Sequence, residues 1–355
     1  MSQNPVWFAL AGLYAVIVTV AISHFSRPIG RRWALMDHPS QIKQHLRSTP
    51  LAGGVALVAV LAPLLPIFMY VFEPSGLGNR ALSVIVIAAL AAGFLGLADD
   101  RRNIRPVVRF VATMAIFACA MLLEPRLIID RVIVTGLGSS FTMPTLAAFS
   151  LSLLIHVGFI NAVNMADGKN GLVIGLSIIW LLFLLTVGPA GLIIVVLPLV
   201  QMLGILLIYN LRGRLFLGDG GTYGLSAFIG LVSVYCYNYA DGAVKADTLA
   251  LLYLVPGIDM LRLVVIRMLQ GRSPFYGDRN HLHHLLKDRF GWPIGLFIYL
   301  IMVAAPIFLA LARPDWTLTL FGFGAASYFV TVLALVFWRR SAVAQGAIFG
   351  SSAAS

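Results

Sequence analysis

The sequence predicts an all-α polytopic membrane protein with about eleven transmembrane helices, and three observations support this fold class. Hydrophobic residues make up 60% of the 355 residues, only 11% are charged, and the mean hydropathy is +0.93. Ordinary soluble domains carry about a quarter of charged residues, so a soluble core could not hide this much apolar surface. The apolar residues also fall into runs long enough to cross a bilayer, which takes roughly 20 residues.

Eleven apolar runs are candidate membrane spans, and polar segments separate most of them. They are residues 5–24, 51–72, 81–98, 107–123, 144–160, 171–188, 190–208, 222–239, 248–268, 293–311 and 315–337. Only Gly188-Pro189 divides the sixth run from the seventh, so the loop between them is very short. The expected organisation is a single transmembrane domain, residues 1–340, followed by a short disordered tail, residues 341–355.

The basic residues predict the orientation of the chain. Twenty of the 25 Lys and Arg residues lie in or after odd-numbered spans, and cytoplasmic loops carry such an excess. We therefore expect the N-terminus outside and the C-terminus in the cytoplasm. Positive charges follow the first apolar run rather than precede it, which disfavours a cleaved signal peptide. The net charge of +11 is explained by topology and by anionic ligands at the membrane surface, not by nucleic acid.

One outside segment differs from the other loops. Between Arg126 and Met143, two β-rich runs flank a turn that contains Gly136 and Gly138. This pattern predicts a short external β-hairpin.

Polar clusters recur at the inner ends of the spans, and the densest is Asn161–Leu172. It contains Asn161, Asn164, Asp167, Lys169 and Asn170. A polar turn shaped by Gly168 and Gly171 is the simple alternative. The recurrence of similar clusters on the same side favours a functional site.

Two further clusters carry carboxylates. Asp99 and Asp100 end a span, where they oppose the helix dipole and each other. A divalent cation, a proton or the neighbouring arginines would relieve this repulsion. Asp219 lies in Gly-Asp-Gly-Gly, a backbone that a metal–diphosphate can approach, although this is not a Walker loop. A simple turn is the alternative.

Basic residues and histidines form the remaining clusters. The first inner loop contains Lys43 and His45 ahead of Gly53-Gly54, where backbone or ligand can approach closely; a basic loop that only sets topology is the alternative. Pro256-Gly257 is expected to interrupt the ninth span. Asp259 and Arg262 lie three apart there, which suits a structural ion pair or a ligand role.

A histidine cluster follows the ninth span. Its candidate phosphate-binding residues are Arg279, His281, His283 and His284. An amphipathic helix at the membrane surface is expected, with Leu282, Leu285, Leu286 and Phe290 on its apolar side. The histidine spacing on one helix is poor for zinc, so contact with phosphate fits the basic surroundings better.

Together these stretches resemble the polyprenyl-phosphate N-acetylhexosamine-1-phosphate transferases. The shared motifs run in one order from Asp37 to His284 and are D-x-P…K-x-H…P…GG, the Asp-Asp pair, N-x-x-N-x-x-D-G, G-D-x-G and R-S-P-F…D-R-x-H-x-H-H. The resemblance implies a multi-pass enzyme of the bacterial inner membrane with a cytoplasmic active site. It also implies transfer of a sugar 1-phosphate from a UDP-sugar to polyprenyl (undecaprenyl) phosphate, a membrane lipid, with release of UMP.

Two positions bear on the sugar. The order His281-Leu282-His283-His284 is similar to the branch that uses UDP-N-acetylglucosamine, so N-acetylglucosamine 1-phosphate is the expected group. Asn170 stands where the family has Asp, and this resembles relatives that use deoxy-sugars. A deoxy-N-acetylhexosamine donor therefore stays an alternative, as does MurNAc-pentapeptide.

The resemblance also implies roles for individual residues around a divalent cation. This cation is expected to be Mg²⁺, with Mn²⁺ as an alternative. The cation would neutralise two phosphates that must meet in line, and its expected ligands are Asp219 and Asn164. Expected catalytic residues are Asp99, Asp100, Asp167, Asp219 and His281. Expected substrate-binding residues are Lys43, His45, Asn161, Asn164, Asn170, Arg279, His283 and His284.

Within these roles, Asp99 and Asp100 would position the lipid phosphate or take its residual proton. A rival of another class is a transporter or lipid flippase, because intramembrane charges and a broken span suit a substrate path. The polar groups gather at one membrane boundary, however, which favours the enzyme. A homodimer is an alternative to a monomer.

Overall fold

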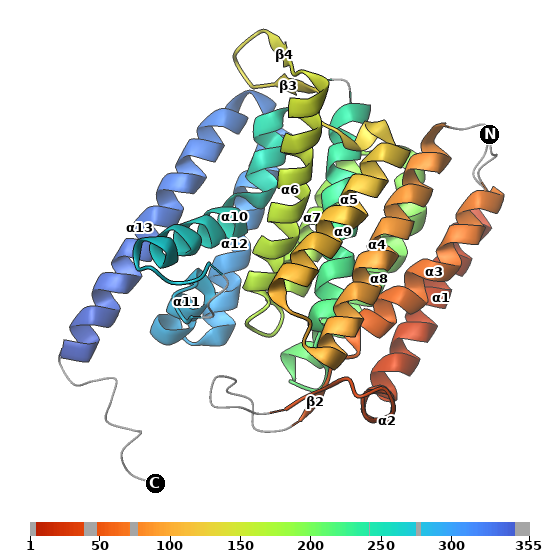
Figure 1. Cartoon of the computed structure of the whole chain (residues 1–355), viewed down its shortest axis with the longest axis horizontal. Coiled ribbons are helices and arrows are strands. Elements are labelled where there is room, and N and C mark those ends of the chain that lie inside the picture. The colour runs from red at the N-terminus through yellow and green to blue at the C-terminus, as the bar shows by residue number, and fades with distance from the viewer. Residues whose placement is uncertain (1–4, 39–47, 72–76, 241, 275–277, 345–355) are drawn as a thin grey trace. The chain divides into compact units, whose positions relative to one another are not determined.

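The computed structural model describes residues 5–38, 48–71, 77–240, 242–274 and 278–344, and these are almost entirely helical (Figure 1). The chain divides into two compact units, residues 1–249 and 250–355. The first unit contains α1 (Pro5–His24), α2 (Ser26–Arg32), α3 (Gly53–Val71), α4 (Leu77–Arg102), α5 (Pro106–Leu123), α6 (Thr145–Ala166), α7 (Leu172–Val187), α8 (Ile193–Leu211) and α9 (Gly218–Tyr239). The helix α10 (Ala246–Leu269) leads into the second unit, which continues with α11 (Leu282–Phe290), α12 (Trp292–Ala312) and α13 (Thr317–Ala344).

Each of the eleven expected spans coincides with one helix, which confirms the all-α membrane fold. Within the described residues, eight helical segments are long and apolar enough to cross a membrane, and Gly53–Pro66 and Leu172–Val187 are shorter apolar helices. The remaining expected span corresponds to α9, which begins with the polar Gly218-Asp219-Gly220-Gly221-Thr222. Because nearly all of α9 is buried against α3, α4, α6 and α7, it does not need a strongly apolar surface of its own.

Glycines let the helices around α9 approach its backbone. A Cβ at Gly96 of α4 would overlap the backbone carbonyl of Asp219, and one at Gly54 of α3 would lie 2.7 Å from the carbonyl carbon of Gly220. A main-chain hydrogen bond also joins the start of α3 to the residues just before α9, since Gly53 N–H donates to Phe216 O at 3.1 Å. Gly53-Gly54 was expected to allow close approach of backbone or ligand, and in the structure it is the backbone of residues 216–221 that approaches.

Two small antiparallel sheets mark the ends of the first unit. The predicted hairpin is confirmed: β3 (Arg131–Ile133) pairs with β4 (Ser140–Thr142) across a turn in which Gly136 and Gly138 have positive φ. The second pair, β1 (Met36–Asp37) with β2 (Thr49–Pro50), brackets the segment 39–47. In Figure 1 the hairpin and the β1–β2 region lie at opposite ends of this unit.

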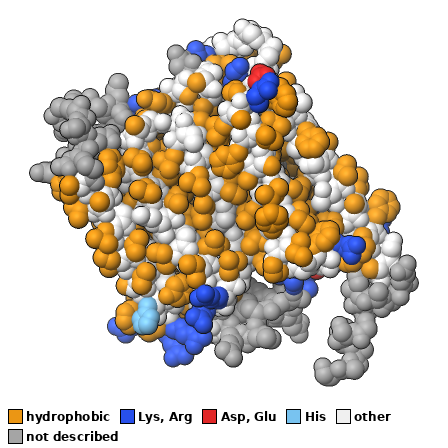
Figure 2. Space-filling model, turned by 180° about the vertical axis from the view of Figure 1, so that it is seen from behind, with side chains coloured by type: hydrophobic (Ala, Val, Ile, Leu, Met, Phe, Trp, Pro, Cys, Tyr) orange, Lys and Arg blue, Asp and Glu red, His pale blue; other side chains and the backbone are white. Residues whose placement is uncertain are grey.

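The outer surface of the helices is apolar. Exposed hydrophobic side chains are frequent, with Leu146 79% and Phe323 71% exposed. In Figure 2 hydrophobic side chains cover most of the visible face, and Lys and Arg gather toward its edges. Soluble monomers rarely expose contiguous apolar patches of more than a few hundred Å². The surface therefore supports a protein embedded in lipid.

The second unit corrects several details of the prediction. Pro256 lies inside α10 without ending it, so the expected interruption of this span is wrong. Leu282, Leu285 and Leu286, which were expected on the apolar side of α11, are buried, and His283 is buried with them. Phe290, expected on the same side, is exposed. Because α11 begins only at Leu282, His281 caps the helix and does not follow its periodicity.

The C-terminal helix is longer than expected. It runs to Ala344, past the predicted start of a disordered tail at residue 341. Residues 345–355 lie outside the described part of the chain.

Candidate active site

Four carboxylates from three separate stretches meet in the first unit. Asp99 and Asp100 lie near the end of α4, Asp167 is the C-cap of α6, and Asp219 is the second residue of α9. Asp219 is close enough to the other three to be affected by their charge. The structure thus joins three of the clusters that the sequence analysis singled out.

Asp99 is buried and orients an arginine. Its Oδ2 accepts a short hydrogen bond from Arg109 Nη1, and its Oδ1 accepts from the Ile104 N–H at 2.7 Å. The same Nη1 lies 3.7 Å from Asp219 Oδ2, so Arg109 links the two acids. Arg109 was counted in the sequence only as a topology residue, and its place beside the carboxylates was missed.

Asp100 caps a helix that lies far away in the sequence. Its Oδ1 accepts from the Asp219 N–H at 2.9 Å and its Oδ2 from the Gly220 N–H at 3.0 Å. A carboxylate at a helix N-terminus satisfies free N–H groups and interacts favourably with the helix dipole. The adjacent acids Asp99 and Asp100 therefore have different partners, and this explains how both are tolerated at the end of α4.

Thr222 and Tyr223 of α9 contact the last turn and the C-cap of α6. Thr222 Oγ1 donates to Asp167 Oδ2 at 2.7 Å, and Asn164 Nδ2 donates to Tyr223 Oη at 3.4 Å. Burial raises the pKa of the Asp167 carboxyl to about 6, which the hydroxyl of Thr222 only partly offsets. Both α9 residues were missed, although positions i+3 and i+4 from Asp219 share its helix face.

Buried Asn210 fixes the loop that carries Asn170. Its Oδ1 accepts from the Gly171 N–H, and its Nδ2 donates to Leu215 O at 3.0 Å. The segments 167–171 and 212–217 are therefore held together, and Asn170 Nδ2 lies 3.9 Å from the position of a Cβ on Gly213. Asn161 is less directed toward this region, because its Nδ2 donates to Val157 O of its own helix at 2.7 Å.

The first inner loop is described only at its two ends. A cavity of about 430 Å³ there is lined by Arg27, Arg31, Met36, His38 and Ser48. The expected phosphate-binding residues Lys43 and His45 lie outside the described residues.

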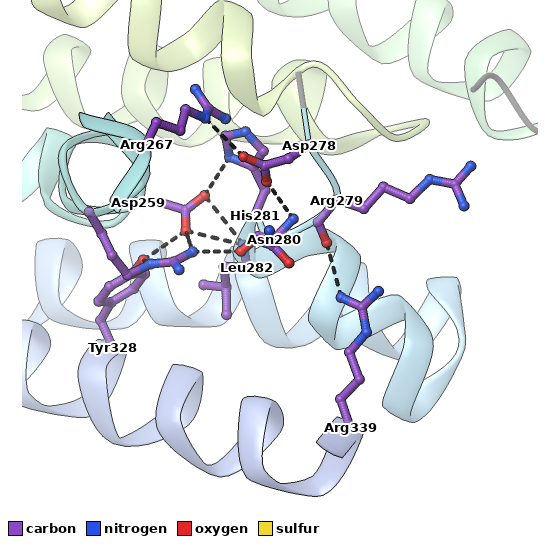
Figure 3. Close-up of polar contacts among 10 residues, drawn as sticks. Asp259, Arg267, Asp278, Arg279, Asn280, His281, Leu282, Tyr328 and Arg339 are labelled. Carbon is purple, nitrogen blue, oxygen red and sulfur yellow. Dashed lines mark hydrogen bonds and ion pairs between the residues drawn. The ribbon is translucent and has the colours of Figure 1, made fainter. Parts of the chain in front are cut away.

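In the second unit, the histidine cluster is tied to α10. Asp259 binds His281, Arg262 and Tyr328, and Arg267 Nε donates to Asp278 Oδ2 at 2.8 Å (Figure 3). The rings of His281 and His283 stack with centroids 5.4 Å apart, and those of His283 and His284 are 4.3 Å apart. Arg279 is exposed, and its backbone carbonyl accepts from Arg339.

Burial would raise the pKa of Asp278 in this loop. The Asn280 N–H and the Arg267 guanidinium outweigh that effect and lower the pKa. This carboxylate is therefore a stable anchor for the segment that precedes His281.

The carboxylate cluster has the donor chemistry that Mg²⁺ prefers. Among the described residues no group of three or more His, Cys, Asp or Glu forms a complete metal site. Mg²⁺ keeps several waters, however, and is commonly held by only one or two carboxylates together with substrate phosphates. The Asp219 side chain is 31% exposed, and Asp167 and Asn164 each have an oxygen beyond the hydrogen bonds given above. This oxygen-rich set fits the ion.

The raised pKa of Asp167 predicts a pH-dependent stability. The folded pKa of about 6 lies above the ordinary value of about 3.9, so the folded state binds the proton more tightly. The free energy of unfolding should therefore fall as pH rises from about 4 to about 6. Thermal unfolding in detergent without Mg²⁺ measures this slope, and Asp167→Asn should reduce it. The exposed Asp130→Asn should keep the wild-type slope; equal slopes in all three proteins would contradict the prediction.

Comparison with known proteins shows what the part of the chain that carries this site is similar to. Residues 82–237 match the model of Glycosyl transferase family 4, and this range contains all four carboxylates. The chain is 28% identical over 309 residues to the decaprenyl-phosphate N-acetylglucosaminephosphotransferase of Mycolicibacterium smegmatis, covering 78% of this chain and 75% of that protein. It is 28% identical over 298 residues to the probable undecaprenyl-phosphate N-acetylglucosaminyl 1-phosphate transferase of Bacillus subtilis, covering 81% and 78%.

A third relative agrees with these two. The undecaprenyl-phosphate alpha-N-acetylglucosaminyl 1-phosphate transferase of Escherichia coli is 26% identical over 307 residues, covering 82% of this chain and 79% of that protein. The helical membrane fold and the position of the carboxylates inside the matched range agree with this similarity to glycosyl transferase family 4.

Proposed function

We propose that this protein transfers N-acetylglucosamine 1-phosphate from UDP-N-acetylglucosamine to polyprenyl phosphate, with undecaprenyl phosphate as the acceptor, and releases UMP. The observation that carries the proposal is the carboxylate cluster with Arg109 at the ends of membrane helices, inside the range that matches the family. The names of the relatives include decaprenyl phosphate or undecaprenyl phosphate. The apolar helices of this protein suit a lipid acceptor of that kind.

In the proposed reaction a phosphate oxygen of the lipid attacks the β-phosphorus of the UDP-sugar. The bond between the β-phosphorus and the bridging oxygen breaks, and UMP leaves with that oxygen. One phosphoanhydride replaces another, so ATP is not needed. The lipid phosphate is already anionic at neutral pH, so repulsion between phosphates is the main obstacle.

The residues of the first unit would reduce this repulsion. Asp219 and Asn164 are the proposed ligands of Mg²⁺, which when bound would neutralise phosphate charge. Arg109, held by Asp99, adds a fixed positive charge beside them. Asp100 maintains the N-terminus of α9, and together with Asp99 it would position the lipid phosphate.

The remaining roles place other groups around the substrates. Asp167 and Asn170 would line the sugar-nucleotide side of the site, together with Asn161. The residues Lys43, His45, Arg279, His281, His283 and His284 would contact phosphates. The protein would lie in a bacterial inner membrane with this site in the cytoplasm, the N-terminus and hairpin outside, and the product would start a lipid-linked glycan of the cell envelope.

A doubly labelled donor tests the reaction. Purified protein receives undecaprenyl phosphate, Mg²⁺ and UDP-N-acetylglucosamine with ³H in the sugar and ³²P in the β-phosphate. Both labels should enter the lipid fraction in equal amounts, with UMP in the aqueous phase. Entry of ³H alone would mean glycosyl transfer with release of UDP, and passage of substrate across vesicles without lipid product would favour a transporter.

The donor is tested in the same assay. Replacing the donor by a UDP-linked deoxy-N-acetylhexosamine or by UDP-MurNAc-pentapeptide should lower the initial rate. Asn170 is the position at which this chain departs from the family pattern, and it lies on a loop fixed by Asn210. An Asn170→Asp variant should change the ratio of rates between donors; an unchanged ratio would remove Asn170 from donor choice.

A further inference from the structure

We propose that Asp259 is a positioning residue that fixes the proton of His281 on Nδ1, so that Nε2 is the ring atom that meets a substrate phosphate. The phosphate contact rests on the proposed function, whereas the position of the proton follows from the contacts within the second unit (Figure 3).

The carboxylate of Asp259 is buried and receives hydrogen bonds from two sides. On one side His281 Nδ1 lies 2.9 Å from Oδ2, and the Leu282 N–H points at both oxygens, 3.1 and 3.3 Å away. On the other side Oδ1 accepts from Arg262 Nη2 at 2.9 Å and from Tyr328 Oη at 2.7 Å. One side chain of α10 thus holds both the histidine ring and the first N–H of α11.

The chemistry of these partners fixes the direction of each bond. Tyr328 Oη accepts from Arg262 Nε at 2.8 Å, so its own hydrogen is free to point at Asp259. The ion pair with Arg262 keeps Asp259 ionised, and an ionised carboxylate only accepts. His281 Nδ1 must therefore carry a proton. A carboxylate has about four acceptor sites, which these donors fill, so Asp259 is not left to bind a metal.

The segment before His281 is anchored to the same helix. Arg262 Nη2 donates to Asn280 O at 2.6 Å, and Arg267 Nη1 donates to Pro274 O at 2.7 Å. Asp278 Oδ1 accepts from the Asn280 N–H at 2.7 Å. Two arginines and an acid therefore fix the backbone on which His281 is mounted.

These contacts leave one edge of the His281 ring for a ligand. Nδ1 is bound to Asp259, one face stacks on His283 with an interplanar angle of 12°, and no described residue hydrogen-bonds Nε2. In the neutral ring Nε2 then has the lone pair. In the imidazolium Nε2–H donates, which suits a phosphate oxygen. Either way the functional atom is the same.

Nitrogen NMR of ¹⁵N-histidine-labelled protein in nanodiscs tests the position of the proton, with His281→Gln to assign the signals. At a pH where the ring is neutral, wild-type His281 should show a protonated Nδ1 and an unprotonated Nε2. Asp259→Asn should invert this pattern. Its amide oxygen is needed by Arg262 and Tyr328, so its NH₂ group faces Nδ1, which must then accept.

The matched control is Asp288→Asn, the same change on α11. The Asp288 carboxylate lies 3.9 Å from Arg339, has no described contact with His281, and should leave the pattern unchanged. Transfer by Asp259→Asn should fall about tenfold to a hundredfold, the range found for residues that orient a metal-ligating histidine.

A neutral wild-type ring with its proton on Nε2, or an Asp259→Asn spectrum equal to wild type, would overturn the proposal. If Asp259→Asn does not fold, the wild-type spectrum by itself tests the proposal. Absence of sugar-phosphate transfer by the wild-type protein counts against the proposed function, and the tautomer result stands without it.

Discussion

Asp219→Ala is expected to lower Mg²⁺-dependent transfer of N-acetylglucosamine 1-phosphate by about a thousandfold or more. Of the two carboxylates that pair with Arg109, Asp219 is the more exposed. It stands at the start of α9, on the same helix as Tyr223, which accepts a hydrogen bond from Asn164. A metal at developing phosphate charge is worth several kcal/mol, and each 1.4 kcal/mol is about tenfold in rate. Initial rates over a range of Mg²⁺ concentrations measure the effect.

The fold should survive this substitution. The bond to Asp100 uses the backbone N–H of residue 219, which alanine keeps. Asp130→Ala, which removes an exposed carboxylate of the same chain, is the matched control and should keep the wild-type rate and Mg²⁺ dependence. Near-wild-type transfer by Asp219→Ala in folded protein would refute the assignment of this residue to the metal.

Gly96→Ala is expected to destabilise the protein and to reduce transfer strongly. The added methyl group would overlap the carbonyl of Asp219, which is backbone and cannot rotate away as a side chain would. Overpacking typically costs about 1–3 kcal/mol, and here α4 and α9 must also separate at the active site. Thermal unfolding in detergent and the transfer rate should therefore both fall.

Gly158→Ala provides the comparison, because a Cβ at Gly158 of α6 meets nothing within 4 Å. Alanine favours the helix by up to about 1 kcal/mol over glycine, so this variant should be as stable as wild type or more stable. If both glycine variants behaved alike, the close packing of α4 on α9 would not be what positions Asp219.

Apolar length and the distribution of polar clusters were enough to predict the helices and three of the stretches that meet at the site. Lipid requires every span to be a long apolar run, so the pattern is strong. The weakest case was α9, whose burial among other helices allows a polar start. The hairpin was also visible, because Gly136 and Gly138 separate two β-rich runs.

Individual partners inside the site were much harder to predict. The positive-inside rule explains any basic residue of an inner loop, so it cannot separate Arg109 from its neighbours Arg101, Arg102 and Arg105. Helix caps are normally provided by the residue just before the helix. A cap provided by Asp100, 119 residues away from Asp219, has no local signal. The tie between Asp259 and His281 also depends on how two helices pack.

The contact of Asp100 with α9 also sets an order for biogenesis. Helices enter the membrane as the chain is made, so α4 is in place long before α9 is synthesised. Until then Asp99 and Asp100 are neighbouring acids without the N–H groups of Asp219 and Gly220. Arrival of α9 supplies these N–H groups, the fourth carboxylate and the hydroxyl for Asp167 in a single docking event. A chain released before residue 218 would insert most of its helices and still have no active site.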